Sequence, residues 1–295
     1  MRIGSRGSAL ALAQAQPIAD ALGGELVVIT TTGDRDRAAG DKGRWVGELE
    51  RALLAGEIDL AVHSAKDVPS ELAEGTELLP SPPRADPRDA LCGAESLDAL
   101  PAGARVGTAS LRRQAQLRAL RPDLEVVELR GNVDTRLRKL ADGDYDAIVL
   151  AAAGLERLGR AAEGTPLDEL VPAAGQGILA LQTQKGTDPF FSHKGTEPPD
   201  RSVPLREKMG SVPLYADAAA TWALAAERAL VRGLAADCDT PVGAYASEGV
   251  LRAFVGRADG SVWLRDELAG DDPEELGAEV ARRLLASGAA EVLRR

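Results

Sequence analysis

Four short segments of the sequence place a cation where a helix is expected to begin. Each segment follows a short apolar run that is typical of a strand, and each contains Gly, Ser or Thr close to the cation. They are Arg6-Gly7-Ser8, Ser64-Ala65-Lys66-Asp67, Thr108-Ala109-Ser110-Leu111-Arg112-Arg113, and Arg130-Gly131-Asn132 followed by Thr135-Arg136. A helix N-terminus is already partly positive, so a cation there costs roughly a few tenths of a kcal/mol. Four such junctions in one chain therefore indicate that an anion binds beside them.

The type of anion follows from the donors at these junctions. Free N–H groups of a helix N-terminus, Ser and Thr hydroxyls and the two-pronged Arg guanidinium all bind carboxylates or phosphates. No GxxxxGK[ST] loop and no GxGxxG after a strand occurs in the sequence, so a nucleotide is not indicated. Many arginines and few glycines at the turns favour a ligand with several carboxylates.

Apolar runs and helical patterns alternate along the chain, which predicts α/β architecture with mostly parallel sheets. Expected strands are 26–31, 59–63, 104–108, 125–129 and 147–151, and expected helices are 9–22, 47–55, 111–120 and 133–141. In such sheets the turns after the strands lie at the carboxyl edge, where ligands bind. The segments 80–88 and 172–177 are rich in Pro or Gly and predict two crossings between domains.

These crossings predict a chain that leaves one domain, builds a second and returns. We expect a discontinuous first domain at 1–84 and 177–200, and a second domain at 85–176. The remaining residues, 201–295, predict a small α+β domain with a helix at 218–234, a strand pair at 250–255 and 261–266, and a final helix at 272–286.

The composition excludes several classes of function. The net charge of −11 argues against a general attraction to nucleic acid or to an anionic membrane, and no run of about 20 apolar residues could span a bilayer. The N-terminus lacks the apolar stretch of a signal peptide. Two cysteines and two histidines make a zinc site improbable. We therefore expect a cytoplasmic protein with free thiols.

The sequence resembles the porphobilinogen deaminase family, also called hydroxymethylbilane synthase, along most of its length. The matching segments, in the family's order, are RIGSRGSALALAQ (2–14), KGRWVGELERALL (42–54), DLAVHSAKDVPSEL (59–72), DPRDAL (86–91), VGTASLRRQAQL (106–117), LRGNVDTRLRKL (129–140), YDAIVLAAAGLERLG (145–159), AAGQG (173–177) and DCDTPVGAYA (237–246). AVHSAKDVP together with SLRR and RGNVDTR is highly specific.

The resemblance implies a fold and an activity. Two lobes similar to those of periplasmic binding proteins would be joined by a third, small α+β domain that carries the cofactor cysteine, here Cys238. That cysteine would hold a dipyrromethane by a thioether. The activity would join four molecules of porphobilinogen head to tail with loss of four ammonia, giving hydroxymethylbilane. The family also suggests a monomer.

The same resemblance assigns roles to individual residues. Asp67 would be the catalytic carboxylate, placed by the pyrrole N–H to stabilise the cation that develops as ammonia leaves, with Lys66 beside it. The acetate and propionate groups of cofactor and substrate would be held by Arg6, Ser8, Lys66, Thr108, Ser110, Arg112, Arg113, Arg130, Arg136 and, more weakly supported, Gln176 and Arg157.

Other residues have an ordinary explanation that competes with a functional one. His63 has the side chain of a general base, but a satisfied histidine near a strand end explains it equally well, so we leave it out of catalysis. Trp45 could cover a pyrrole ring or simply pack. Residues 33–42 are charged and could form a lid over a cleft. Cys92 is expected to be a small core residue. Two aspartates flank Cys238 and would raise the pKa of its thiol, so its role comes from the resemblance alone.

Two alternatives stay open from the sequence. A two-lobed protein that binds anions or carboxylates without catalysis would share the arginine-rich turns, although it would not need the third domain. An inactive homologue is the other alternative, because residues 183–215 do not resemble the family and form an insertion with little periodicity.

Overall fold

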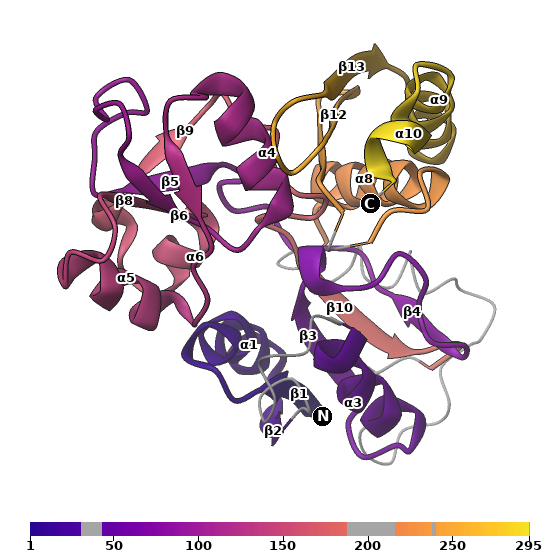
Figure 1. Cartoon of the computed structure of the whole chain (residues 1–295). Coiled ribbons are helices and arrows are strands. Elements are labelled where there is room, and N and C mark those ends of the chain that lie inside the picture. Colours follow the sequence, from indigo (N-terminus) through magenta and orange to yellow (C-terminus); the bar gives the residue numbers. More distant parts are fainter. Residues whose placement is uncertain (31–42, 188–215, 238–239, 295) are drawn as a thin grey trace, which may run out of the picture. The chain divides into compact units, whose positions relative to one another are not determined.

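The chain forms two compact units in the computed structural model, which describes residues 1–30, 43–187, 216–237 and 240–294. The first unit consists of residues 1–84 and 178–221, and the second of residues 85–177 and 222–295 (Figure 1). The chain therefore passes between the units three times, at 84–85, 177–178 and 221–222. Both of the Pro- or Gly-rich segments expected from the sequence lie at such a passage.

The first unit is built on a five-stranded sheet of order β2-β1-β3-β10-β4. Its strands are β1 (Arg2–Arg6), β2 (Glu25–Ile29), β3 (Leu60–Ser64), β4 (Thr76–Leu78) and β10 (Leu179–Gln184). Strands β2, β1 and β3 are parallel, whereas β10 runs antiparallel to both β3 and β4. The carboxyl ends of β1 and β3 are consequently neighbours at one edge.

Among the described residues of this unit, two helices pack on the sheet. Helix α1 (Ala9–Leu22) contributes Ala15, Ile18 and Ala19 to a core with Ile3 and Leu60, and α3 (Gly43–Leu54) contributes Leu49 and Leu53 to a second core with Ile58 and Ala61. A Cβ on Gly4 would lie 2.3 Å from Cδ1 of Ile58, so glycine in β1 is what allows this second core to close against the strand.

The second unit contains another five-stranded sheet, of order β7-β6-β8-β5-β9. Its strands are β5 (Asp89–Cys92), β6 (Arg105–Gly107), β7 (Glu125–Val127), β8 (Ala147–Ala151) and β9 (Thr165–Leu167). Helices α4 (Leu111–Leu120), α5 (Val133–Ala141) and α6 (Ala152–Arg157) follow β6, β7 and β8, respectively. The second unit also contains the short 3-10 helix η2 (Ala161–Glu163), and the first unit contains η1 (Ala65–Asp67). Cys92 is fully buried in a core with Leu129 and Ile148, which confirms its expected packing role.

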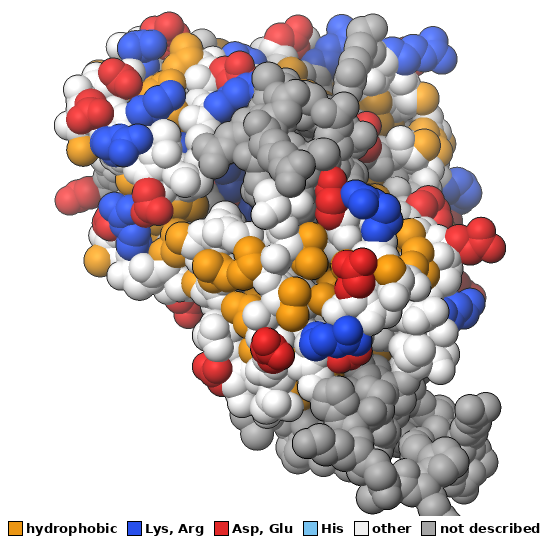
Figure 2. Space-filling view, turned by 90° about the horizontal axis from the view of Figure 1, so that it is seen from below, with side chains coloured by type: hydrophobic (Ala, Val, Ile, Leu, Met, Phe, Trp, Pro, Cys, Tyr) orange, Lys and Arg blue, Asp and Glu red, His pale blue; other side chains and the backbone are white. Residues whose placement is uncertain are grey.

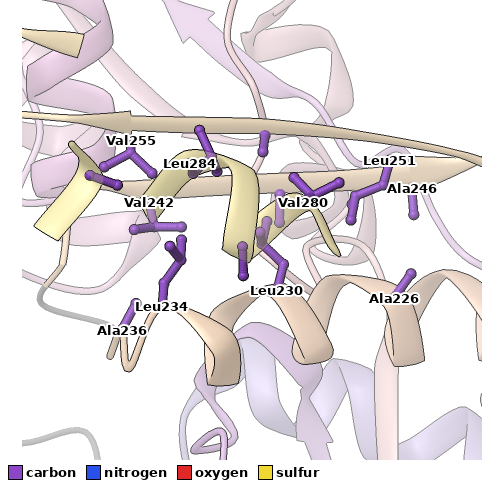
Figure 3. Close-up of a cluster of buried hydrophobic side chains, with 14 of the residues drawn as sticks. Ala226, Leu230, Leu234, Ala236, Val242, Ala246, Leu251, Val255, Val280 and Leu284 are labelled. Carbon is purple, nitrogen blue, oxygen red and sulfur yellow. The ribbon is translucent and has the colours of Figure 1, made fainter. Parts of the chain in front are cut away.

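The rest of the second unit is a small α+β part. An antiparallel sheet of β11 (Val242–Ser247), β12 (Val250–Gly256) and β13 (Trp263–Ala269) packs with helices α8 (Ala218–Gly233), α9 (Pro273–Ala286) and α10 (Ala289–Leu293). Leu230 of α8, Leu234 directly after it, Val242 and Val255 of the sheet and Val280 of α9 meet in one apolar cluster (Figure 3). The described fold thus has the expected architecture of two α/β lobes and a small α+β domain; the predicted domain boundaries stay a prediction.

The expectation of mostly parallel sheets is wrong. In each five-stranded sheet two neighbouring pairs are parallel and two are antiparallel. The reason lies in the crossings. Asp89, the first residue of β5, pairs with Ala151, the last residue of β8, and Leu179 at the start of β10 pairs with Ser64 at the end of β3. Because each crossing delivers the chain to the carboxyl edge of the parallel strands, the next strand must run back.

Surface charges on the described residues are of both signs. On the face seen in Figure 2, Lys, Arg, Asp and Glu side chains are interspersed with apolar ones and do not form one basic area. No helix in the described part of the chain is long and apolar enough to cross a bilayer. The same residues contain no group of three His, Cys, Asp or Glu side chains that could hold a metal ion.

Candidate active site

The carboxyl edge of the first unit gathers four of the predicted site residues. Arg6 ends β1, and Ser8 follows it as the N-cap of α1. Lys66 and Asp67 lie on η1, directly after β3. Because β1 and β3 are adjacent and parallel, both junctions open at the same edge of the sheet. We call Arg6, Ser8, Lys66 and Asp67 the first edge.

Ser8 shows how the local sequence builds this edge. Its Oγ accepts a hydrogen bond from the Ala11 N–H at 3.3 Å, which caps the fourteen-residue helix α1. The first turn of α1 contains no acidic side chain. The partial positive charge of this helix end is thus left for an outside anion, as the sequence predicts.

His63 lies next to the ionisable residues of the first edge. Burial lowers the pKa of its imidazole to about 4, while neighbouring Gln182 and Asp67 act to raise this pKa and Arg6 acts to lower it. The side chain is therefore neutral near pH 7. A base with so low a pKa abstracts protons poorly at that pH, which argues against a general base. The Nε2 of His63 is buried without a hydrogen-bond partner among the described residues, so the expected satisfied histidine is not what the structure shows either.

The carboxyl edge of the second unit is formed by the parallel strands β7, β6 and β8. Thr108 follows β6 and is completely buried, and its Oγ1 accepts a hydrogen bond from the Ser110 N–H at 3.2 Å. Ser110 is the N-cap of α4, but its hydroxyl makes no capping bond. The Ser110 hydroxyl is therefore not used to stabilise the helix.

Arg112 and Arg113, in the first turn of α4, both bind the carboxylate of Asp89. Arg112 donates from Nη1 to Oδ2 at 2.7 Å and from Nη2 to Oδ1 at 3.0 Å, and Arg113 donates from Nε to Oδ1 at 2.9 Å. The Nε2 of Gln176 donates to the same Oδ1 at 2.9 Å. Asp89 is 0%, Gln176 1%, Arg112 4% and Arg113 5% exposed. We call these four residues the Asp89 cluster.

The Asp89 cluster carries an excess of positive charge. Burial alone would raise the pKa of Asp89, but Arg112, Arg113 and Gln176 hold that pKa below its ordinary range, so the carboxylate is ionised. Two guanidiniums and one carboxylate leave one positive charge buried. The Nε of Arg112 is also buried without a hydrogen-bond partner among the described residues. Buried charge and unmet donors are costly, and a bound anion would offset both.

Arg136 adds to this excess. Its Nε donates to the Gly131 carbonyl at 2.8 Å, and it has no ion pair with any residue that the structure describes. Burial, followed by repulsion from Arg113, lowers the pKa of Arg136 to about 10, so it stays charged near pH 7. Arg113 thus acts on Arg136 as a like charge.

Two other predicted arginines behave differently. Arg130 is exposed and its Nε pairs with Glu128 at 2.7 Å, so it lies outside the buried group. Arg157, at the end of α6, donates from Nη2 to the Gly177 carbonyl at 2.7 Å, and burial lowers its pKa. Arg157 thereby holds the end of the second crossing, where Gln176 also reaches Asp89.

Several predictions fall on residues outside the described part of the chain. These are the attachment residue Cys238, the suggested lid at 33–42 and residues 188–215 of the insertion; the side chain of Trp45 is not described either. At its start the expected insertion is wrong, because Thr183 and Gln184 belong to β10 and pair with β4.

Two buried carboxylates were missed by the sequence analysis. Asp89 belongs to the quoted DPRDAL segment, and its signal was an acidic residue opening an apolar strand. Glu227 of α8 is fully buried and accepts hydrogen bonds from the N–H groups of Gly175 at 2.6 Å and Ala246 at 2.8 Å. Its signal was its spacing: it lies four residues after Ala223 and three before Leu230, on the apolar face of α8.

The family models and the curated relatives that match this sequence agree on one family. The family model described as "Porphobilinogen deaminase, dipyromethane cofactor binding domain" matches residues 1–191, and the model of the porphobilinogen deaminase C-terminal domain matches residues 221–286. The porphobilinogen deaminase of Roseiflexus castenholzii is 47% identical, and that of Syntrophus aciditrophicus 42%; each comparison covers 98% of this chain and 96% of the relative. Among solved structures, an ancestral cationic amino acid solute binding protein is similar with a TM-score of 0.40 at 15% identity, over 63% of this chain and 82% of that one.

Proposed function

The chain belongs to the porphobilinogen deaminase family, and we propose that it is a hydroxymethylbilane synthase. It would join four porphobilinogen molecules head to tail, release four molecules of ammonia, and yield the linear tetrapyrrole hydroxymethylbilane. The observation that carries this proposal is the buried positive excess of the Asp89 cluster, beside the charged Arg136. Each pyrrole of this chemistry bears two carboxylates, so an anion of that kind is what the excess charge fits.

The cofactor of this family is a dipyrromethane, and the residues at the carboxyl edge of the second unit fit such a group. When bound, it supplies the terminal pyrrole carbon to which the first substrate is joined. The Ser110 hydroxyl is not used as a cap, the Arg112 Nε is unsatisfied, and Arg136 has no ion pair among described residues. These groups would hold carboxylates of the dipyrromethane. Attachment to Cys238 is proposed from the resemblance of the DCDTPVGAYA segment (237–246) to the family. Residues 238 and 239 of this segment lie outside the described part of the chain.

Arg112 and Arg113 would act as a pair with one spare charge. Since Asp89 already engages both guanidiniums, a pyrrole carboxylate would meet arginines whose orientation is fixed in advance. Such preorganisation lowers the cost of binding, because few side-chain rotations must be frozen. Arg130 is exposed and would contribute only at the rim of this group.

The first edge would carry the chemistry. The carboxylate of Asp67 would accept a hydrogen bond from the pyrrole N–H of porphobilinogen and stabilise the positive charge that develops as ammonia leaves. Arg6, Ser8 and Lys66 would hold the substrate's acetate and propionate groups. Because His63 is neutral near pH 7, it adds no further positive charge to the first edge.

The mass of the intact protein tests the proposal directly. Protein made in cells that supply porphobilinogen should be heavier than its sequence by one dipyrromethane, and the excess should vanish in Cys238→Ala. The loaded protein should then consume porphobilinogen and release ammonia in equal amounts. Protein with the mass of the bare sequence, in cells with ample porphobilinogen, would contradict the proposal and favour an anion-binding protein without catalysis.

An inactive homologue is separated by the same pair of measurements. Loaded protein that does not consume porphobilinogen would point to the insertion, and replacement of residues 188–215, which leaves β10 intact, by a short helical linker would then be expected to restore turnover. The proposal also includes a cytoplasmic location and a monomeric state, as expected of a biosynthetic enzyme of this family.

A further inference from the structure

Gln116, in the middle of α4, holds both backbone groups of one residue. Its Nε2 donates to the Val171 carbonyl at 3.0 Å, and its Oε1 accepts from the Val171 N–H at 2.8 Å. The Gln116 side chain is completely buried. One amide thus satisfies Val171 as a neighbouring strand would, just before the crossing at 172–177.

The same carbonyl also orients Arg112. Arg112 lies one helical turn before Gln116 on the same face of α4, and its Nη1 donates to the Val171 carbonyl at 2.7 Å as well as to Asp89. The guanidinium is therefore fixed between two acceptors, one charged and one neutral. If Val171 moved, Arg112 would lose the acceptor that defines its position within the Asp89 cluster.

Strand β11 holds this segment from the other side. The Ala244 N–H donates to the Pro172 carbonyl at 2.9 Å. A Cβ on Gly243 would lie 2.9 Å from the Val171 carbonyl oxygen and 3.0 Å from its Cγ1, so only glycine lets the two backbones approach this closely. Since β11 begins at Val242, four residues after Cys238, one short segment joins the predicted attachment loop to Arg112.

We propose that Gln116 is a positioning residue for carboxylate binding: it holds Val171 so that β11 and the guanidinium of Arg112 keep one fixed relation. The inference rests on the proposed function, since it concerns how Arg112 meets a pyrrole carboxylate. One consequence does not depend on that function: the hydrogen bond from the Val171 N–H to Gln116 should slow hydrogen exchange of this amide.

The variant Gln116→Met tests the proposal, because methionine nearly conserves volume but neither donates nor accepts these bonds. Hydrogen exchange of the Val171 amide should become at least tenfold faster in the unloaded protein. In loaded protein, kcat/KM for porphobilinogen should fall about 10- to 100-fold, since small misplacements of binding groups have effects of that size, and the loss should appear chiefly as a higher KM.

Two comparisons separate positioning from simple loss of stability. Arg121 ends the same helix and donates to the Leu97 and Leu100 carbonyls, so Arg121→Gln should lower the melting temperature and leave kcat/KM unchanged. In an Arg112→Lys background, Gln116→Met should add less than a twofold further loss, because its effect passes through Arg112.

The proposal would be overturned if Gln116→Met lowered kcat/KM by the same factor in the Arg112→Lys background as in the wild type. It would also be overturned if loaded Gln116→Met kept the wild-type kcat/KM. If Gln116→Met does not fold, Gln116→Glu keeps the acceptor for the Val171 N–H, loses the donor and adds an anion beside Arg112. That variant should raise KM as well, and an unchanged KM would again overturn the proposal. If the wild-type protein carried no cofactor and showed no turnover, the proposed function itself would be contradicted. The exchange rate of the Val171 amide would still test the two hydrogen bonds between Gln116 and Val171.

Discussion

The carboxyl edges of the two five-stranded sheets hold their charges in different ways. In the first unit, Arg6, Lys66 and Asp67 are half-buried, and the neighbouring His63 is neutral. In the second unit, Arg112, Arg113 and Asp89 are almost completely buried and are joined by hydrogen bonds of 2.7–3.0 Å. Similar strand–turn–helix junctions therefore produce a partly solvated acid in one place and a rigid cationic cluster in the other.

Under the proposed function both edges would bind carboxylates, and the first would in addition supply the catalytic carboxylate of Asp67 from a half-buried position. A site that binds several carboxylates needs fixed positive charge. Asp89 joins Arg112 and Arg113 by buried hydrogen bonds and cancels only one of their two charges, so one fixed positive charge would remain for a carboxylate.

Removal of the Asp67 carboxylate should have the largest effect on activity. In Asp67→Ala, kcat should fall about 10²- to 10⁴-fold, because no other described acid of the first edge can take its place, while the melting temperature stays close to that of the wild type. Steady-state consumption of porphobilinogen and a thermal melt measure both quantities. A near-normal kcat would contradict the catalytic role proposed for Asp67 and, with it, the proposed difference between the two edges.

Asp89→Asn should damage the fold more than the chemistry. It leaves two buried guanidiniums without a counter-charge, so the free energy of unfolding should fall by about 3–5 kcal/mol, measured by urea denaturation. Asp86→Asn is the matched control: Asp86 pairs with the more exposed Arg88 at 2.7 Å and should cost at most about 1 kcal/mol. Equal losses in the two variants would mean that Asp89 is no more important than a surface ion pair.

His63 provides a pH test confined to the first unit. Its pKa is about 4 in the folded chain, below the ordinary 6.5, so between these values the unfolded chain binds a proton that the folded chain does not. The stabilising contribution is therefore complete above pH 6.5 and is lost as the pH falls towards 4, on the order of 2 kcal/mol by pH 4.5. In His63→Gln this component should disappear from urea denaturation curves recorded between pH 4.5 and 7. If the free energy of unfolding of His63→Gln depended on pH as steeply as that of the wild type, the pH dependence could not be assigned to His63.

Local patterns predicted the positions of the two edges well. The junctions at Arg6, Lys66, Arg112 and Arg136 all lie at the carboxyl ends of parallel strands, because strand, turn and helix signals are written in adjacent residues. Partners distant in sequence were not predictable in this way. Asp89 is 23 residues from Arg112, and only the antiparallel return of β5 brings the two together.

The direction of β5 and β10 shows the same limit. An apolar run predicts a strand but does not state which way it runs, and the direction was set by the edge at which each crossing arrives. Glu227 is an intermediate case. Its place on the apolar face of α8 could have identified it as buried, but not its backbone partners at Gly175 and Ala246.

The smallest expected effect compares the two serine N-caps. Ser8 caps α1 with its Oγ, so Ser8→Ala should lower the free energy of unfolding by about 1 kcal/mol. Ser110 is the N-cap of α4 but makes no capping bond, so Ser110→Ala should change stability by less than about 0.5 kcal/mol. If the Ser110 hydroxyl instead serves a carboxylate, the KM for porphobilinogen should rise severalfold in Ser110→Ala. Urea denaturation and steady-state kinetics of the same two variants decide this, and a stability loss in Ser110→Ala equal to that in Ser8→Ala would mean that both hydroxyls serve their helices.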